Sequence, residues 1–178
     1  MTKHAMGLAL VIAFATPAFA QHSHKQTHQP QHNHAPYSSF QNREIKALSQ
    51  QQIDDLKSGK GMSLALPAEL NGYPGPAHSL ELADPLKLTQ QQKQRMEELF
   101  SAMSNEAKKL GLEVIEAERN LDALFKNKTV NPQNLRDATL KAGEAQARLR
   151  ESHLRYHLLT IEVLSTEQIA SYNRLRGY

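Results

Sequence analysis

The histidines are the residues of this sequence whose number and spacing most strongly suggest chemistry. The 178 residues include nine His and no Cys, which excludes a thiol nucleophile, a disulfide and a thiolate metal site. A transition-metal site must therefore take its ligands from His, Glu, Asp or Met. Imidazole and carboxylate ligands suit Zn, Cu, Ni and Co, so a divalent transition metal is the expected cofactor. No motif indicates an organic cofactor.

Five of the histidines lie in one polar segment near the N-terminus. The segment reads QHSHKQTHQPQHNHAPYSSFQN, and it has too few apolar residues to fold. We therefore expect a disordered tail over residues 21–42. Clustered imidazoles on a flexible chain can gather around a divalent cation; the alternative interpretation is a solubilising tail. The candidate tail ligands are His22, His24, His28, His32 and His34.

The first twenty residues have the pattern of a secretory signal. Lys3 and His4 precede an apolar run over 5–15, and Ala18-Phe19-Ala20 supplies the small-x-small pattern of a cleavage site. The run is too short to span a bilayer. We expect a signal peptide over 1–20, cleavage after Ala20 and a periplasmic protein that does not span the membrane. The absence of Cys suits an oxidising compartment.

Three copies of a helix-start motif follow the tail. Each copy reads L-[ST]-x-x-Q, and the three begin at Leu48, Leu88 and Leu164. In such a capping box the hydroxyl accepts a hydrogen bond from the amide three residues on, and the Gln side chain reaches back. The copies predict helices that begin after Ser49, Thr89 and Ser165. A further short helix is expected to end near Asp84, ahead of Pro85.

Two apolar series of equal length predict a helical hairpin. Both have coiled-coil spacing and span 28 residues, about 42 Å of helix. The break between them, 127–131, ends in Asn131, a capping residue, and Pro132 suits a first helical turn. Antiparallel folding pairs position 96 with 163 and 124 with 135. The series are Met96, Phe100, Met103, Ala107, Leu110, Val114, Ala117, Leu121 and Leu124, then Leu135, Ala138, Ala142, Ala145, Leu149, Ser152, Tyr156, Leu159 and Val163.

The predicted hairpin carries a second candidate metal site. His153 and His157 are four residues apart and share a helix face beside the apolar series. Glu97 lies on the corresponding flank of the first long helix, and a segment that folds back on this flank brings His78 close. The candidate ligands in the folded part are His78, Glu97, His153 and His157. The alternative is that these histidines are solvated, packed or paired with nearby Glu.

Composition and motifs exclude other classes of protein. The sequence has no Gly-rich phosphate loop, no nucleophile elbow and no HExxH, so we expect no catalysis. The net charge is +3, and basic residues are scattered among acidic ones, which argues against nucleic-acid binding. The length suits a single folded domain. We predict an all-α fold: a long antiparallel, coiled-coil-like hairpin with short flanking helices, over residues 43–178.

Two segments resemble a known family. The stretches ELNGYPGPAHSLELADPLKLTQQQ and LSTEQIASYNRLRGY are similar to the Spy/CpxP-like periplasmic superfamily, which carries L-T-x-x-Q motifs, and in particular to its periplasmic heavy-metal-sensor branch. The resemblance covers roughly residues 43–178. It implies a homodimer that acts in heavy-metal resistance or envelope stress.

The resemblance leaves two functions open. One is a metal sensor or buffer with a membrane signalling partner. In metal-sensing members the ligands come from the first helix, an acidic residue on the long helix, and a His with a partner one turn later on the third helix. The other is an ATP-independent holding chaperone for unfolded client proteins. Such a chaperone would use an exposed apolar face, to which Met62, Leu64, Leu66 and Leu70 are the candidate contributors.

Overall fold

The computed structural model describes residues 37–178, and these residues contain helices and no strand. The predicted signal peptide and the five tail histidines lie outside the described residues. Among those described, none of the helices has the length and apolar character that crossing a membrane requires. The elements are a 3-10 turn η1 (Ser38–Phe40) and helices α1 (Gln50–Ser58), α2 (Leu66–Glu69), α3 (Pro76–Glu81), α4 (Gln90–Lys126), α5 (Pro132–Ile161) and α6 (Thr166–Arg176).

The helix starts follow the capping motifs. Ser49, Thr89 and Ser165 each accept a hydrogen bond from the amide three residues later, and the Gln of each motif accepts one from the capping residue's own amide. Asn131 forms a fourth capping box at the start of α5. The helix starts predicted from local sequence are therefore confirmed. The helix expected to end near Asp84 ends earlier, because α3 stops at Glu81 and turns lead into α4.

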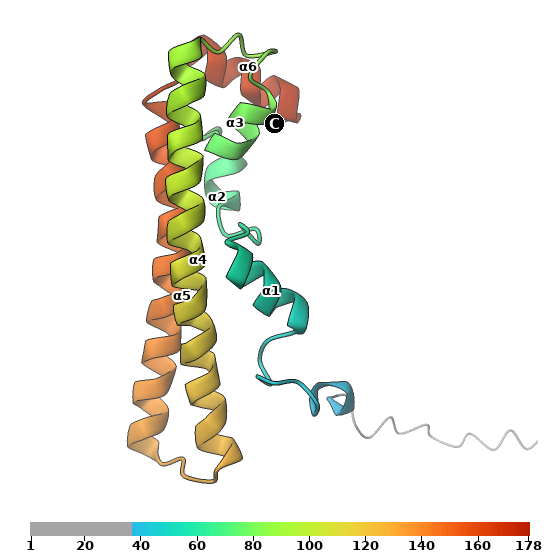
Figure 1. Cartoon of the computed structure of the whole chain (residues 1–178), viewed down its shortest axis with the longest axis vertical. Coiled ribbons are helices and arrows are strands. Elements are labelled where there is room, and N and C mark those ends of the chain that lie inside the picture. Colours follow the sequence, from blue (N-terminus) through green and yellow to red (C-terminus); the bar gives the residue numbers. More distant parts are fainter. Residues whose placement is uncertain (1–36) are drawn as a thin grey trace, which may run out of the picture. The chain divides into compact units, whose positions relative to one another are not determined.

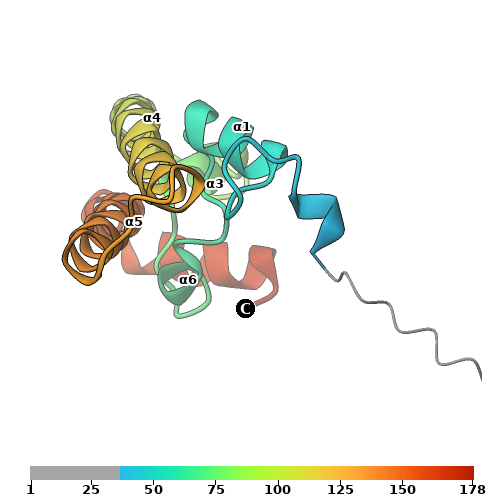
Figure 2. The same ribbon diagram turned by 90° about the horizontal axis from the view of Figure 1, so that it is seen from below.

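Helices α4 and α5 form the predicted antiparallel hairpin (Figures 1 and 2). Two ion pairs at 2.6 Å cross it, from Arg148 to Glu113 and from Arg155 to Glu106. Both acidic partners lie two residues from the positions that pairing the apolar series predicts. The hairpin and its approximate register are therefore confirmed.

Helix α4 buries a second face that the apolar series does not include. Helices α1 and α3 pack along α4, on the side visible in Figure 1. Phe100, a member of the predicted series, is instead 41% exposed. The heptad pattern is thus incomplete because it assumes one partner helix, whereas α4 has three. The additional buried residues on α4 are Leu99, Gly111 and Ile115.

The contact between α1 and α4 depends on a glycine. A Cβ at Gly111 would lie 2.3 Å from the carbonyl oxygen of Leu56, so the two backbones approach as closely as a glycine allows. This approach lets the apolar face of α1 reach the hairpin. The resulting core contains Ile45, Ile53, Leu56, Ala107, Val114, Ile115, Ala145 and Leu149.

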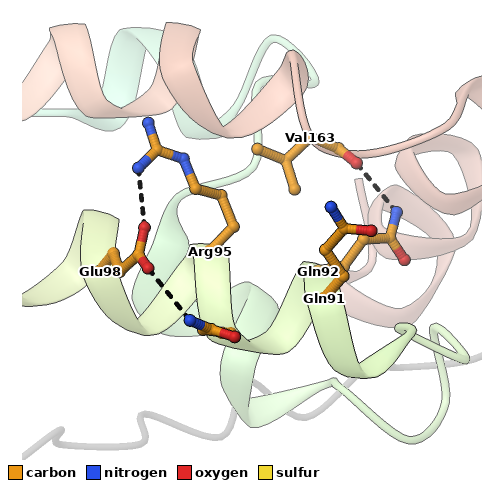
Figure 3. Close-up of a pocket in the computed structure, with 6 residues that line it drawn as sticks. Gln91, Gln92, Arg95, Glu98 and Val163 are labelled. Carbon is orange, nitrogen blue, oxygen red and sulfur yellow. Dashed lines mark hydrogen bonds and ion pairs between the residues drawn. The ribbon is translucent and has the colours of Figure 1, made fainter.

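Two of the capping glutamines join the base of the hairpin to α6. The side-chain amides of Gln92 and Gln168 donate to each other's oxygen at 2.8 and 3.0 Å. Gln92 also donates to the carbonyl of Val163 at 2.9 Å (Figure 3), and Gln168 donates to that of Leu86 at 3.3 Å. The starts of α4 and α6 are therefore locked together, and the lock requires an amide rather than a carboxylate.

Replacing this amide by a carboxylate tests the lock. Gln92→Glu and Gln168→Glu keep the oxygen that caps the helix but lose the donor, so each is expected to lower the free energy of unfolding by about 1–3 kcal/mol. Gln52 is the matched control, because it occupies the same motif position in an exposed capping box, and Gln52→Glu is expected to change stability by less than about 0.5 kcal/mol. Urea unfolding measures all three. Equal losses of stability in all three variants would show that the contact between Gln92 and Gln168 adds nothing beyond helix capping, and would contradict this account.

Candidate metal-binding pocket

One pocket gathers all three histidines of residues 37–178. It has a volume of about 510 Å³ and lies between the loop after α1, helices α2 and α3, and the hairpin. His78 comes from α3, whereas His153 and His157 lie one turn apart on α5. The acidic side chain in the lining is Glu69 of α2, and Met62, Leu66, Phe100 and Met103 supply apolar wall.

A hydrogen bond to the backbone fixes the tautomer of His157. The residue is 7% exposed, and its Nδ1 lies 2.6 Å from the carbonyl oxygen of Tyr73. A carbonyl only accepts hydrogen bonds, so Nδ1 carries the proton and donates it. The neutral ring therefore keeps its lone pair on Nε2. A backbone carbonyl bound to one ring nitrogen is the usual way in which a protein orients a metal-binding imidazole.

The segment before α3 covers the His157 ring at Gly75. A Cβ at Gly75 would lie 2.8 Å from Cε1 and 3.0 Å from Nε2 of His157. The φ angle of Gly75 is −94°, so glycine is needed here for space and not for a left-handed backbone. The segment 73–76 thus packs closely against α5. This packing explains why His157, which was predicted to lie beside the apolar series, is buried.

His153 presents an unpartnered nitrogen to the pocket. Its side chain is 3% exposed, and its Nε2 is buried with no hydrogen-bond partner among the described residues. Burial, and then the nearby His157, lower the pKa of His153, so the ring is neutral at pH 7. A neutral imidazole with a free nitrogen is the form that binds a metal ion.

Glu69 is a buried carboxylate at the centre of this region. Its Oε1 accepts a hydrogen bond from the Tyr172 hydroxyl at 2.5 Å and one from His78 Nδ1 at 3.2 Å, and Arg176 Nε lies 3.4 Å away. Its Oε2 has no hydrogen-bond partner in the described part and lies 3.8 Å from His157 Nδ1. Burial and the bond to Glu69 raise the pKa of Tyr172. One carboxylate therefore contacts residues of α3, α5 and α6.

Sequence reasoning missed Glu69 and proposed Glu97 instead. Glu97 is exposed on α4 and does not line the pocket. Glu69 belongs to a four-residue helix, which is too short for hydrophobic periodicity to detect. The one signal was its position at the start of the family-like stretch ELNGYPGP.

The donors fit a metal ion in type, although their present arrangement is not a complete site. In the described range, no three His, Asp or Glu side chains are already placed to hold one ion together. The unpartnered Nε2 of His153 and Oε2 of Glu69, together with Nε2 of His157, are suitable donors. Coordination by three or more of these groups therefore requires side-chain rearrangement.

The buried His153 makes stability depend on pH. An unperturbed histidine side chain has a pKa of about 6.5, and the pKa of His153 in the folded protein is lower, so between these two values the unfolded chain binds more protons. The folded state therefore loses stability as the pH falls below about 6.5. We expect His153→Gln to flatten this fall, as measured by urea unfolding from pH 8 to pH 5. His157, His78 and Glu69 are retained in both proteins. An unchanged pH dependence in the variant would contradict the assignment.

Comparison with known proteins identifies the family. The family model for heavy-metal resistance matches residues 64–171, a range that contains Glu69 and all three pocket histidines. Searches of curated proteins and of solved structures give no match. The match covers more than half of the chain and agrees with the resemblance to the Spy/CpxP-like proteins. The chain therefore belongs to the heavy-metal-resistance family of helical proteins.

Proposed function

We propose that this protein is a non-catalytic periplasmic metal-binding protein that acts as a sensor or buffer in heavy-metal resistance. His153 and His157 hold a divalent transition ion, Zn, Cu, Ni or Co, with Glu69 and His78 as further ligands. The observation that carries this proposal is the buried, unpartnered Nε2 of His153 in a pocket with two other imidazoles. The family match to heavy-metal resistance supports it.

The energetics of the pocket favour an occupant. A buried polar atom without a hydrogen bond costs about 1–3 kcal/mol, and here both His153 and Glu69 carry such an atom. A metal ion bound to both atoms offsets these costs. Water alone satisfies a neutral nitrogen, but it does not explain why a carboxylate and three imidazoles converge on the same pocket.

The placement of the ligands suits a sensor. His153 and His157 belong to the long hairpin, whereas Glu69 and His78 belong to the short helices that pack on it. An ion bound by both groups ties the short helices to the hairpin. It thereby shifts the protein towards the arrangement that binds it best. A homodimer interface or a membrane signalling partner would respond to this change in arrangement. The tail histidines would bind metal ions at a separate site.

A holding chaperone is the second candidate function. Three residues expected on an apolar binding face are exposed, namely Met62, Leu66 and Leu70, and the last is 56% exposed. Leu64 packs instead against the core beneath α1. Exposed apolar surface of this kind is typical of protein interaction sites, and it favours binding of unfolded client proteins.

Calorimetry with matched variants tests the metal-binding proposal. The protein is recovered after export with its five tail histidines replaced by Gln, and Zn²⁺, Cu²⁺, Ni²⁺ and Co²⁺ are titrated in. We expect stoichiometric binding of at least one ion. The double variant His153→Gln/His157→Gln is expected to weaken it by roughly 100-fold, and Glu69→Gln by about tenfold or more. Glu97→Gln is the control, because Glu97 is exposed and outside the pocket.

The outcomes separate the candidates. If no ion binds more tightly than it binds to buffer, the folded part is not a metal site. Metal-independent suppression of client aggregation would then establish the chaperone. If Glu97→Gln weakens binding and Glu69→Gln does not, the carboxylate ligand is Glu97.

A further inference from the structure

Sulfur atoms line the same pocket as the histidines. Residues 37–178 contain three Met; Met62 and Met103 line the pocket, whereas Met96 is fully buried in the core at the base of the hairpin. We propose that the pocket takes a soft monovalent ion, Cu⁺ or its analogue Ag⁺, which the thioethers of Met62 and Met103 bind together with the imidazoles of His153 and His157. This inference rests on the proposed function, that the pocket histidines bind a metal ion, and adds a soft monovalent ion to the divalent ions proposed there.

Met103 lies close to the level of His157 on the facing helix. Glu106 of α4 pairs with Arg155 at 2.6 Å and accepts a hydrogen bond from Tyr156 at 3.1 Å, so this turn of α4 faces residues 155–156. Met103 comes three residues before Glu106, in the direction in which α5 runs on to His157. Since both helices rise about 1.5 Å per residue, the two side chains reach the pocket at similar heights.

The loop after α1 brings Met62 to the same place. This loop begins against α4, because a Cβ at Gly59 would lie 2.9 Å from the carbonyl oxygen of Ser104, the residue after Met103. A hydrogen bond of 2.7 Å from the Leu64 amide to the Gly61 carbonyl closes the turn. Met62 lines the same pocket as Met103, and the residue is 36% exposed.

The backbone at Met62 is held in an unfavourable conformation. Its φ is 44° and that of Ser63 is 63°, which places two consecutive non-glycine residues in the left-handed region. Residues with a Cβ rarely adopt this conformation, and it persists only where the surrounding structure imposes it. Such strain is concentrated at binding sites, which agrees with a ligand role for Met62.

The donors match a soft ion of low charge. Thioethers select Cu⁺ over Zn²⁺ and the other borderline divalent ions. Burial lowers the pKa of His153, so its ring is neutral at pH 7, and Leu66 and Phe100 contribute apolar wall. A low-charge ion loses less hydration energy in such surroundings than a divalent one does. Oε1 of Glu69 already accepts hydrogen bonds from Tyr172 and His78, so the proposed monovalent site uses the two thioethers and the two imidazoles.

The alternative is that the two methionines only fill space, as Met often does in irregular cores. Met103 also packs against the core at the base of the hairpin. Leu has nearly the same volume as Met, so Met→Leu keeps the packing and removes the sulfur. At position 62 it also keeps the backbone strain, because Leu and Met both carry a Cβ.

A comparison of ion affinities tests the proposal. Cu⁺ is titrated against a chromophoric Cu⁺ chelator, and Ag⁺ and Zn²⁺ by calorimetry, into exported protein whose tail histidines are replaced by Gln. The double variant Met62→Leu/Met103→Leu is expected to lose about tenfold more affinity for Cu⁺ and Ag⁺ than for Zn²⁺. Met96→Leu is the matched control, because it removes the one described thioether outside the pocket.

Methyl NMR gives a second, independent measurement. In protein with ¹³C-labelled Met methyl groups, one equivalent of Ag⁺ is expected to shift the Met62 and Met103 signals and to leave that of Met96 in place. The inference is overturned if Ag⁺ binds the double Leu variant as tightly as it binds the protein with both methionines, and if it shifts neither Met signal in the latter. The proposed function would still stand. If none of the ions binds, both are overturned. Ag⁺ binding that is unaffected by His153→Gln/His157→Gln would contradict a joint site.

Discussion

The burial of one carboxylate, that of Glu69, is the constraint on which the arrangement of the short helices depends. A charge out of contact with water is costly unless hydrogen bonds compensate it. Here the compensation comes from Tyr172 of α6, which is fully buried, and from His78 of α3. The same contacts of Glu69 therefore hold α6 in place, hold α3 against α2 and shape the histidine pocket.

The hairpin was predictable from the sequence, whereas the pocket was predictable only in part. Capping boxes and heptad spacing are local, so the helix starts and the α4–α5 register follow from nearby residues. The burial of His153 and the position of Glu69 in the pocket depend on segments that are far apart in sequence and meet only after folding. The contact at Gly111 is of the same kind, because nothing near that residue indicates that α1 packs on it.

The candidate metal donors and some of the exposed apolar residues line the same pocket. The long hairpin supplies His153 and His157 on a rigid helix, and the shorter elements supply Glu69, His78 and the strained loop with Met62. In the proposed function an ion therefore binds between a rigid and a more adaptable element. Met62 and Leu66 also belong to the exposed apolar surface, so ion binding and client or partner binding would affect each other through the same loop.

The most direct test of the central claim, that the pocket histidines bind a metal ion, is a long-range ¹H–¹⁵N NMR spectrum of the imidazole rings. The tail histidines are replaced by Gln, and one equivalent of Zn²⁺ is added. We predict that the Nε2 signals of His153 and His157 move to metal-bound positions, while Nδ1 of His157 stays protonated through its bond to Tyr73. Unchanged signals from both rings at saturating Zn²⁺ would contradict the account.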